Sequence, residues 1–150
     1  MLAKLSEAIR NWRTRHRLDS CGIGFGGPVD FYSQRVVLST HVEGWNDFDL
    51  PAYLGPLIGC TPVMDNDANA GALGEALHGA GRGARPLFYM TLSTGIGGGL
   101  VLDDGSVYRG VDSYAGEIGH LTVQSDGPEC LCGSRGCLER MCSGLSLERL

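Results

Sequence analysis

Thr61-Pro-Val-Met-Asp-Asn-Asp-Ala-Asn-Ala70 joins a short apolar strand to an alanine-rich helix that the sequence predicts over residues 70–80. Most side chains at this junction are acidic or amide groups, namely Asp65, Asn66, Asp67 and Asn69. A helix N-cap favours Asn or Asp, but one cap accounts for only one of these residues. Ligands of α/β proteins bind where the carboxyl end of a strand meets the start of a helix. The junction therefore favours a ligand site over capping alone.

A histidine followed by three cysteines forms a second cluster, at His120, Cys130, Cys132 and Cys137. One imidazole and three thiolates are the donor set of a closed tetrahedral zinc site. Gly133 and Gly136 allow the sharp turns that aim successive sulfurs at one point. Glu117 and Glu139 flank the cluster, so a bound metal would rigidify a segment that carries two carboxylates. The pattern predicts structural zinc.

Disulfide bonds and redox-active thiols are the alternatives to zinc, because the chain has six cysteines and an even count suits a secreted scaffold. Residues 1–17, however, are rich in charged side chains and lack the apolar run of a signal peptide. In a reducing cytoplasm, clustered thiols are more often metal ligands. We therefore expect a cytoplasmic protein and favour zinc.

The composition limits the classes of partner. A formal net charge of −5 argues against nucleic acid, which requires a basic surface, and no apolar stretch is long enough to span a bilayer. The first segment predicts a helix with an apolar face made of Leu2, Leu5, Ile9 and Trp12. Its basic residues cluster within positions 10–17. We interpret this cluster as a solvated helix face and assign it no function.

The segment Cys21-Gly-Ile-Gly-Phe-Gly-Gly-Pro-Val-Asp30 matches the dinucleotide pattern G-x-G-x-x-G by letter. That fingerprint requires a helix directly afterwards, whereas residues 28–32 and 35–38 predict a hairpin. We therefore reject a Rossmann site. Gly26 and Gly27 are expected to let the backbone approach a ligand closely.

A second glycine-rich segment, Ser93-Thr-Gly-Ile-Gly-Gly-Gly99, follows a predicted strand at residues 86–92. A second strand is expected at residues 100–102, then a turn at 103–105 and a returning strand at 107–109. Backbone N–H groups of such a loop can converge on phosphate oxygens, since glycine permits positive φ and close approach, and Thr94 adds a hydroxyl. No Gly-Lys-Ser/Thr follows, so the loop is not of the Walker A type. We predict a phosphate-binding loop.

Four motifs occur in one order between residues 20 and 142. They are Asp65-Asn-Asp-Ala-Asn-Ala70, Leu92-Ser-Thr-Gly-Ile-Gly-Gly-Gly-Leu100, Gly116-Glu-Ile-Gly-His120 and Cys130-x-Cys-Gly-x-x-Gly-Cys-x-Glu139. In this order they resemble the ROK family of sugar kinases and related regulators. The resemblance implies an actin-like ATPase fold, in which two RNase H-like α/β domains enclose a cleft. Residues 1–85 would be the latter part of the N-terminal sugar-binding domain, and residues 86–150 the beginning of the C-terminal domain, with the zinc loop at 120–139.

The same resemblance assigns the residues of the site. Asp67 would be the general base that takes a proton from a sugar hydroxyl. Other sugar contacts would come from the backbone of Gly26 or Gly27 and from the side chains of Asn66, Glu117, His120 and Glu139. The nucleotide phosphates would be held by Ser93, Thr94, Gly95, Gly97 and Gly98. Structural zinc would be bound by His120, Cys130, Cys132 and Cys137.

The activity implied by the resemblance is ATP-dependent phosphorylation of a hexose, with glucose to glucose 6-phosphate as the leading reaction and Mg²⁺ as the companion of ATP. Alternatives are an N-acetylmannosamine or N-acetylglucosamine kinase and a sugar-sensing transcriptional regulator. Kinases of this type are often homodimers. The family's N-terminal Asp-x-Gly-Gly-Thr phosphate loop and its adenine-binding segment have no counterpart in the sequence. We therefore expect an internal piece of a longer kinase.

Overall fold

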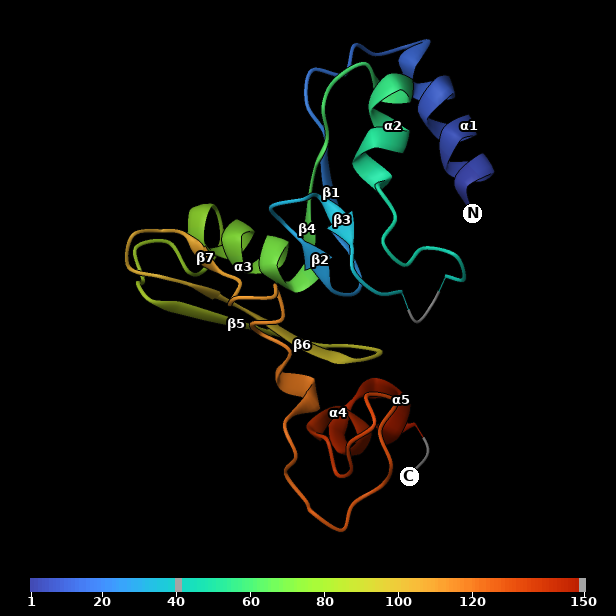
Figure 1. The fold of residues 1–150 in the computed structure, drawn as a ribbon. Coiled ribbons are helices and arrows are strands. Elements are labelled where there is room, and N and C mark those ends of the chain that lie inside the picture. The colour runs from blue at the N-terminus through green and yellow to red at the C-terminus, as the bar shows by residue number, and fades with distance from the viewer. Residues whose placement is uncertain (40–41, 149–150) are drawn as a thin grey trace. The chain divides into compact units, whose positions relative to one another are not determined.

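The structure, a computed structural model, describes residues 1–39 and 42–148 and divides into two compact units, Met1–Asp67 and Ala68–Leu150 (Figure 1). This division falls after Asp67, the first residue of the helix at the junction, and earlier than the boundary after residue 85 that the sequence suggests for the domains. The boundary after residue 85 stays a prediction, and residues 149 and 150 of the second expected domain lie outside the described part. Each unit is described by itself.

The first unit contains a parallel pair of strands, β1 (Gly22–Phe25) and β4 (Val63–Asn66). In their register Gly22 lies beside Val63 and Phe25 beside Asn66, so both strands end at the same edge. Between them in the chain, β2 (Val29–Asp30) and β3 (Arg35–Val36) form an antiparallel hairpin. The predicted hairpin is thereby confirmed. No helix follows the glycine segment directly, which agrees with the rejection of a Rossmann site.

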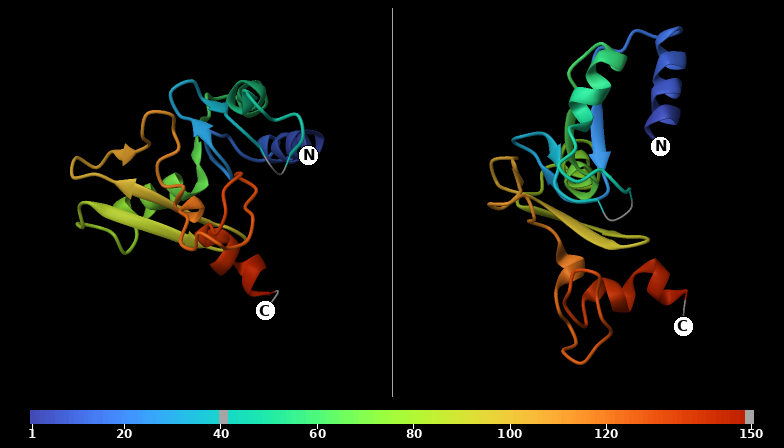
Figure 2. Two further views of the ribbon diagram at one scale, coloured as in Figure 1. Left: turned by 60° about the horizontal axis from the view of Figure 1, so that its bottom comes forward. Right: turned by 45° about the vertical axis from the view of Figure 1, so that its right-hand side comes forward.

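Two helices of the first unit, α1 (Leu2–Arg13) and α2 (Leu50–Ile58), lie side by side (Figures 1 and 2). The side chain of Asp49 caps α2 by accepting a hydrogen bond from the Ala52 N–H (2.8 Å). The buried core of the unit consists of Val29, Val36, Trp45, Leu50, Leu54, Ile58 and Met64. The predicted apolar face of α1 is only partly used: Leu2 and Ile9 pack against this core, whereas Trp12 is 64% exposed.

The second unit is built on an antiparallel sheet of β5 (Leu87–Leu92), β6 (Ile96–Val101) and β7 (Val107–Tyr108) (Figure 2). Helix α3 (Asp67–Leu77) packs on one face through small residues, with Ala72 and Ala76 in one buried cluster with Val101 and Val107. Three expected boundaries are wrong. The helix runs from Asp67 to Leu77 instead of from residue 70 to residue 80, and β6 begins at Ile96 instead of residue 100.

The rest of the second unit is mostly irregular. A short 3₁₀ turn, η1 (Ile118–His120), precedes the cysteine loop, and α4 (Leu138–Cys142) and α5 (Gly144–Leu147) follow it. The Leu138 N–H donates to the Leu121 carbonyl (2.9 Å), which ties the two ends of the loop together. Among the residues described, no helix is both long and apolar enough to cross a membrane.

The packing of α3 on β6 generates a stability prediction. A Cβ at Gly99 would lie 2.6 Å from the Ala72 Cβ and 2.8 Å from the Ala68 carbonyl oxygen. We expect Gly99→Ala to lower the free energy of unfolding by about 1–3 kcal/mol, because the helix must move away from the strand. Urea denaturation followed by circular dichroism measures this change.

Gly74 provides the matched control, because it lies on the exposed side of α3 with nothing within 4 Å of an added Cβ. Gly74→Ala should leave stability unchanged or raise it by up to about 1 kcal/mol, since alanine is the better helix former. Equal effects of the two substitutions would contradict the close packing of α3 on β6.

Candidate functional site

The strand-to-helix junction of the first unit gathers the predicted base and its neighbours. Asn66 is the last residue of β4 and Asp67 the first of α3. The Asn66 side-chain amide donates to the Gly27 carbonyl (3.1 Å), and a Cβ at Gly26 would lie 3.6 Å from Oδ2 of Asp67. These contacts form because the parallel strands β1 and β4 end at one edge of their sheet. A carboxylate, an amide and two glycines at such an edge can bind a polar ligand.

The predicted phosphate loop is shorter than the sequence suggests. Leu92 and Ile96 are the last pair of the β5–β6 ladder, so only Ser93, Thr94 and Gly95 lie between the strands. Gly97 and Gly98 belong to β6, and the expectation that they form part of the loop is wrong. None of the described glycines from 95 to 99 adopts the positive φ expected of them. These glycines instead allow neighbouring elements to pack closely. A Cβ at Gly97, for example, would lie 3.3 Å from the Thr91 side chain and 3.5 Å from the Ala68 Cβ.

The histidine and three cysteines of the predicted zinc site lie together. One ligand atom from each of His120, Cys130, Cys132 and Cys137 can be chosen so that all four lie within 4.8 Å of one another. The Sγ atoms of Cys132 and Cys137 are 3.6 Å apart, far longer than a disulfide bond. Two thiolates on one tetrahedral zinc ion are separated by about 3.8 Å, as follows from the Zn–S bond length. The donor set therefore fits zinc.

The cysteine thiols differ in their tendency to ionise. Hydrogen bonding by the Ser134 backbone, helped by the neighbouring cysteines, lowers the pKa of Cys132 to about 7. Burial, together with the adjacent thiols of Cys130 and Cys132, raises the pKa of Cys137 to about 12. A buried thiolate needs a compensating positive charge. A divalent cation among the sulfurs would supply that charge and is thus consistent with the placement of Cys137.

His120 presents its two ring nitrogens to different groups. Nδ1 lies 3.6 Å from the Cys130 Sγ, and Nε2 lies 3.9 Å from a Glu117 carboxylate oxygen. Binding a metal through Nδ1 would leave the Nε2–H directed toward Glu117 and available as a donor. The structure therefore brings Glu117 close to His120, which lies with the three cysteines of the predicted zinc site.

Glu139 contacts the β5–β6 loop. Its Oε2 accepts a hydrogen bond from the Ile96 N–H (2.8 Å). A Cβ added at Gly119 would lie 3.3 Å from the Glu139 Cβ. A Cβ at Gly119 would also collide with the Ile96 carbonyl oxygen. Neither Ile96 nor Gly119 is predicted from the sequence to belong to the site. The glycine between Glu117 and His120 is the one sequence feature that indicates a close backbone contact here, because glycine has no side chain.

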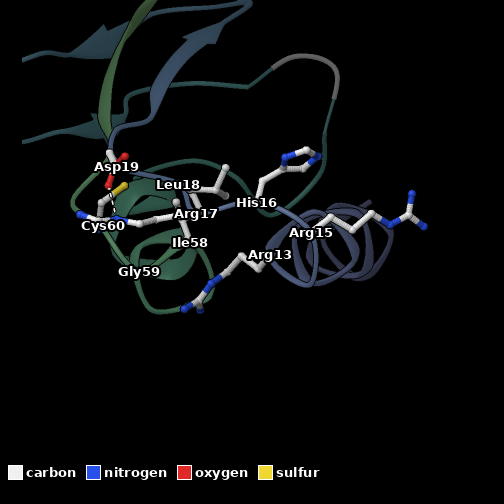
Figure 3. A pocket seen from close by; sticks show the side chains of 9 residues that line it. All are labelled: Arg13, Arg15, His16, Arg17, Leu18, Asp19, Ile58, Gly59 and Cys60. Atoms are coloured by element: carbon white, nitrogen blue, oxygen red, sulfur yellow. Dashed lines mark hydrogen bonds and ion pairs between the residues drawn. The ribbon is translucent and has the colours of Figure 1, made fainter.

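A hollow of about 670 Å³ lies on the first unit where α1 and α2 end (Figure 3). Arg13 extends toward Gly59 and donates to the Leu57 carbonyl (3.0 Å), Arg17 pairs with Asp19 (2.6 Å), and Arg15 points away. Basic side chains at helix C-termini are favourable for the helix dipole. The basic residues of positions 10–17 are all exposed, as expected of a solvated surface, but only Arg10 and Arg13 lie on α1. The interpretation as a helix face is therefore confirmed for these two residues and wrong for the others.

The chain matches the ROK family over residues 1–150 and belongs to it. It is 40% identical over 139 residues to a glucokinase of Halalkalibacterium halodurans, covering 91% of this chain and 42% of that protein. It is 36% identical over 126 residues to a xylose repressor of Bacillus spizizenii, covering 84% of this chain and 33% of that protein.

A solved ROK family glucokinase from Streptomyces griseus, in complex with glucose and AMPPNP, superposes with a TM-score of 0.85 at 35% identity. The alignment covers 98% of this chain and 46% of that one. The chain thus spans less than half the length of these three proteins. The expected α/β fold is confirmed as that of the ROK family.

The cysteine cluster generates a prediction about metal content. We expect the purified chain to hold zinc in equimolar amount and Cys132→Ser to lose most of it, because one of the four donors is removed. Cys132 is exposed, so the substitution leaves the core intact. Elemental analysis after gel filtration measures the bound zinc.

Cys142 is the control for this substitution, since it is exposed and lies outside the group of four donors. Cys142→Ser should retain zinc at the level of the unaltered chain. Zinc lost to the same extent from both variants would contradict the assignment of the ligands.

Proposed function

We propose that this chain carries the base-bearing and phosphate-loop segments of an ATP-dependent hexose kinase with an actin-like ATPase fold, and that glucose is converted to glucose 6-phosphate. Membership of the ROK family and similarity to glucokinases support the class of reaction. The arrangement of Asp67 with Asn66, Gly26 and Gly27 is the observation that carries the proposal.

Asp67 serves as the general base. Its carboxylate takes the proton of the sugar 6-hydroxyl as that oxygen forms a bond to the γ-phosphorus of ATP. The bond from this phosphorus to the bridging oxygen breaks, ADP leaves, and the proton passes from Asp67 to solvent. Phosphoryl transfer requires mainly positioning and charge stabilisation, so one well-placed carboxylate suffices as base.

The remaining polar groups orient the sugar. The family resemblance assigns Asn66, Glu117, His120 and Glu139 to the other hydroxyls. A hydroxyl left unpaired in a closed site costs about 1–3 kcal/mol, so several such partners suit a hexose. The zinc ligands hold the segment that carries His120 and Glu139, and zinc is structural in this proposal.

The nucleotide is assigned to the β5–β6 hairpin. Backbone N–H groups and the hydroxyls of Ser93 and Thr94 contact the phosphates, while Gly97 and Gly98 contribute by keeping the strand free of side chains. Magnesium, when bound with ATP, neutralises charge on the β- and γ-phosphates.

A sugar-responsive regulator is the second candidate, favoured by the similarity to a xylose repressor. A regulator needs a bound sugar but no base. Asp67 at the junction therefore favours catalysis. Among sugars, N-acetylmannosamine and N-acetylglucosamine are the alternatives to glucose.

Replacement of the base tests the kinase. Asp67→Asn should reduce ADP release from Mg-ATP and glucose by roughly 10²–10⁴-fold, because the proton acceptor is lost, and should leave glucose binding nearly intact. A coupled ADP assay across a panel of hexoses and N-acetylhexosamines measures turnover and names the sugar. Calorimetry measures binding.

Asp103, exposed in the β6–β7 turn, provides the control, and Asp103→Asn should retain full turnover. Sugar binding without ADP release by the unaltered chain would favour the regulator. An Asp67→Asn variant that kept most of its turnover would exclude Asp67 as the base.

Zinc removal tests the link between the metal and the sugar. A chelator should weaken glucose binding at least about tenfold, because His120 and the α4 segment lose the ion that orients them. Titration calorimetry before and after chelation, and again after zinc is restored, measures the change. Unchanged affinity in a zinc-free sample would separate the metal from sugar binding.

A further inference from the structure

Both ends of the loop between β5 and β6 are held by residues that follow the cysteine loop. At one end the Ile96 N–H donates to Oε2 of Glu139 (2.8 Å). At the other end the Gly144 N–H donates to the Ser93 carbonyl (2.8 Å). The conformation of the loop is therefore determined in part by contacts from outside its own hairpin.

The contact of Glu139 with the loop is close. A Cβ at Gly95 would lie 2.5 Å from Oε2 of Glu139, so no larger residue fits there without movement of the carboxylate. A Cβ at Gly119 would meet both the Ile96 carbonyl oxygen and the Glu139 Cβ. Ile96 thus donates its N–H to Glu139, while its carbonyl lies against the backbone of η1.

Glu139 is itself fixed by the cysteine loop. It lies in the first turn of α4, two residues after Cys137, which is fully buried. The side chain is partly buried, and a carboxylate that accepts a backbone N–H forms a stronger hydrogen bond than a neutral acceptor does. This bond connects the cysteine loop directly to the hairpin.

We propose that Glu139 is a positioning residue for the phosphate loop, holding the Ile96 N–H with Oε2 while its other carboxylate oxygen engages the hexose. This rests on the proposed function for the identity of the two ligands. A hexose that orders Glu139 then also orders the loop, which raises the affinity for the nucleotide. By thermodynamic linkage the nucleotide raises the affinity for the hexose by the same factor.

The test compares Glu139→Ala with Glu139→Gln in the absence of sugar. Glutamine retains an oxygen that can accept from Ile96, whereas alanine does not. We expect the Ile96 amide to exchange its hydrogen faster in Glu139→Ala than in the unaltered chain, with Glu139→Gln in between. The dissociation constant of Mg-AMPPNP should rise roughly tenfold in Glu139→Ala and distinctly less in Glu139→Gln.

Glu148→Ala, at an exposed carboxylate beyond α5, is the control and should match the unaltered chain in both measurements. Unchanged Ile96 exchange in Glu139→Ala would overturn the proposal, as would an AMPPNP affinity that is identical in Glu139→Ala and the unaltered chain. If the unaltered chain binds no AMPPNP while the exchange rates differ as expected, the kinase proposal fails and the positioning of the loop by Glu139 stands.

Discussion

The close approach of β6 to its neighbours is the constraint on which the second unit depends. On one side Gly99 packs against α3. A methyl group or any longer side chain at this position would collide with Ala72 and Ala68. Elsewhere along the strand a Cβ at Gly116 would collide with the Gly98 carbonyl oxygen, and one at Gly119 with that of Ile96. Side chains at these positions would separate the strand from both neighbours. The lack of side chains thus allows η1, which carries His120, to reach the Ile96 end of the hairpin.

In the first unit the proposed base, Asp67, is held by strand pairing instead. The parallel register of β1 and β4 places the glycines after one strand beside the Asn and Asp after the other. The Gln34 side chain contacts the backbone of Met64, in the middle of β4, accepting from its N–H (2.6 Å) and donating to its carbonyl (3.0 Å). A side-chain amide thus provides β4 with the hydrogen bonds that a further strand would make. The junction at Asp67 is consequently supported through the strand that leads to it.

Kinases and sugar-responsive repressors impose different demands on one scaffold. Both need a rigid set of hydroxyl partners. The segment that carries Glu117, His120 and Glu139, rigidified by the predicted zinc site, would suit either purpose. Only a kinase needs a base and a loop shaped for phosphates. Both classes require the segment that carries Glu139, whereas only a kinase requires the β5–β6 loop. In the proposed kinase, the hydrogen bond between Glu139 and Ile96 joins the two.

Several local features could be predicted from the amino-acid sequence: the strand-to-helix junction, the β2–β3 hairpin and the grouping of one histidine with three cysteines. Each depends on residue types a short distance apart, so spacing was sufficient to predict them. The strand at Gly97–Gly99 could not be predicted, because glycine has a low strand propensity and only packing against α3 requires it there. Nor could the contact of Glu139 with Ile96, whose partners are 43 residues apart in the chain. Such contacts follow from the tertiary structure alone, because they form only where the fold brings two distant segments of backbone close together.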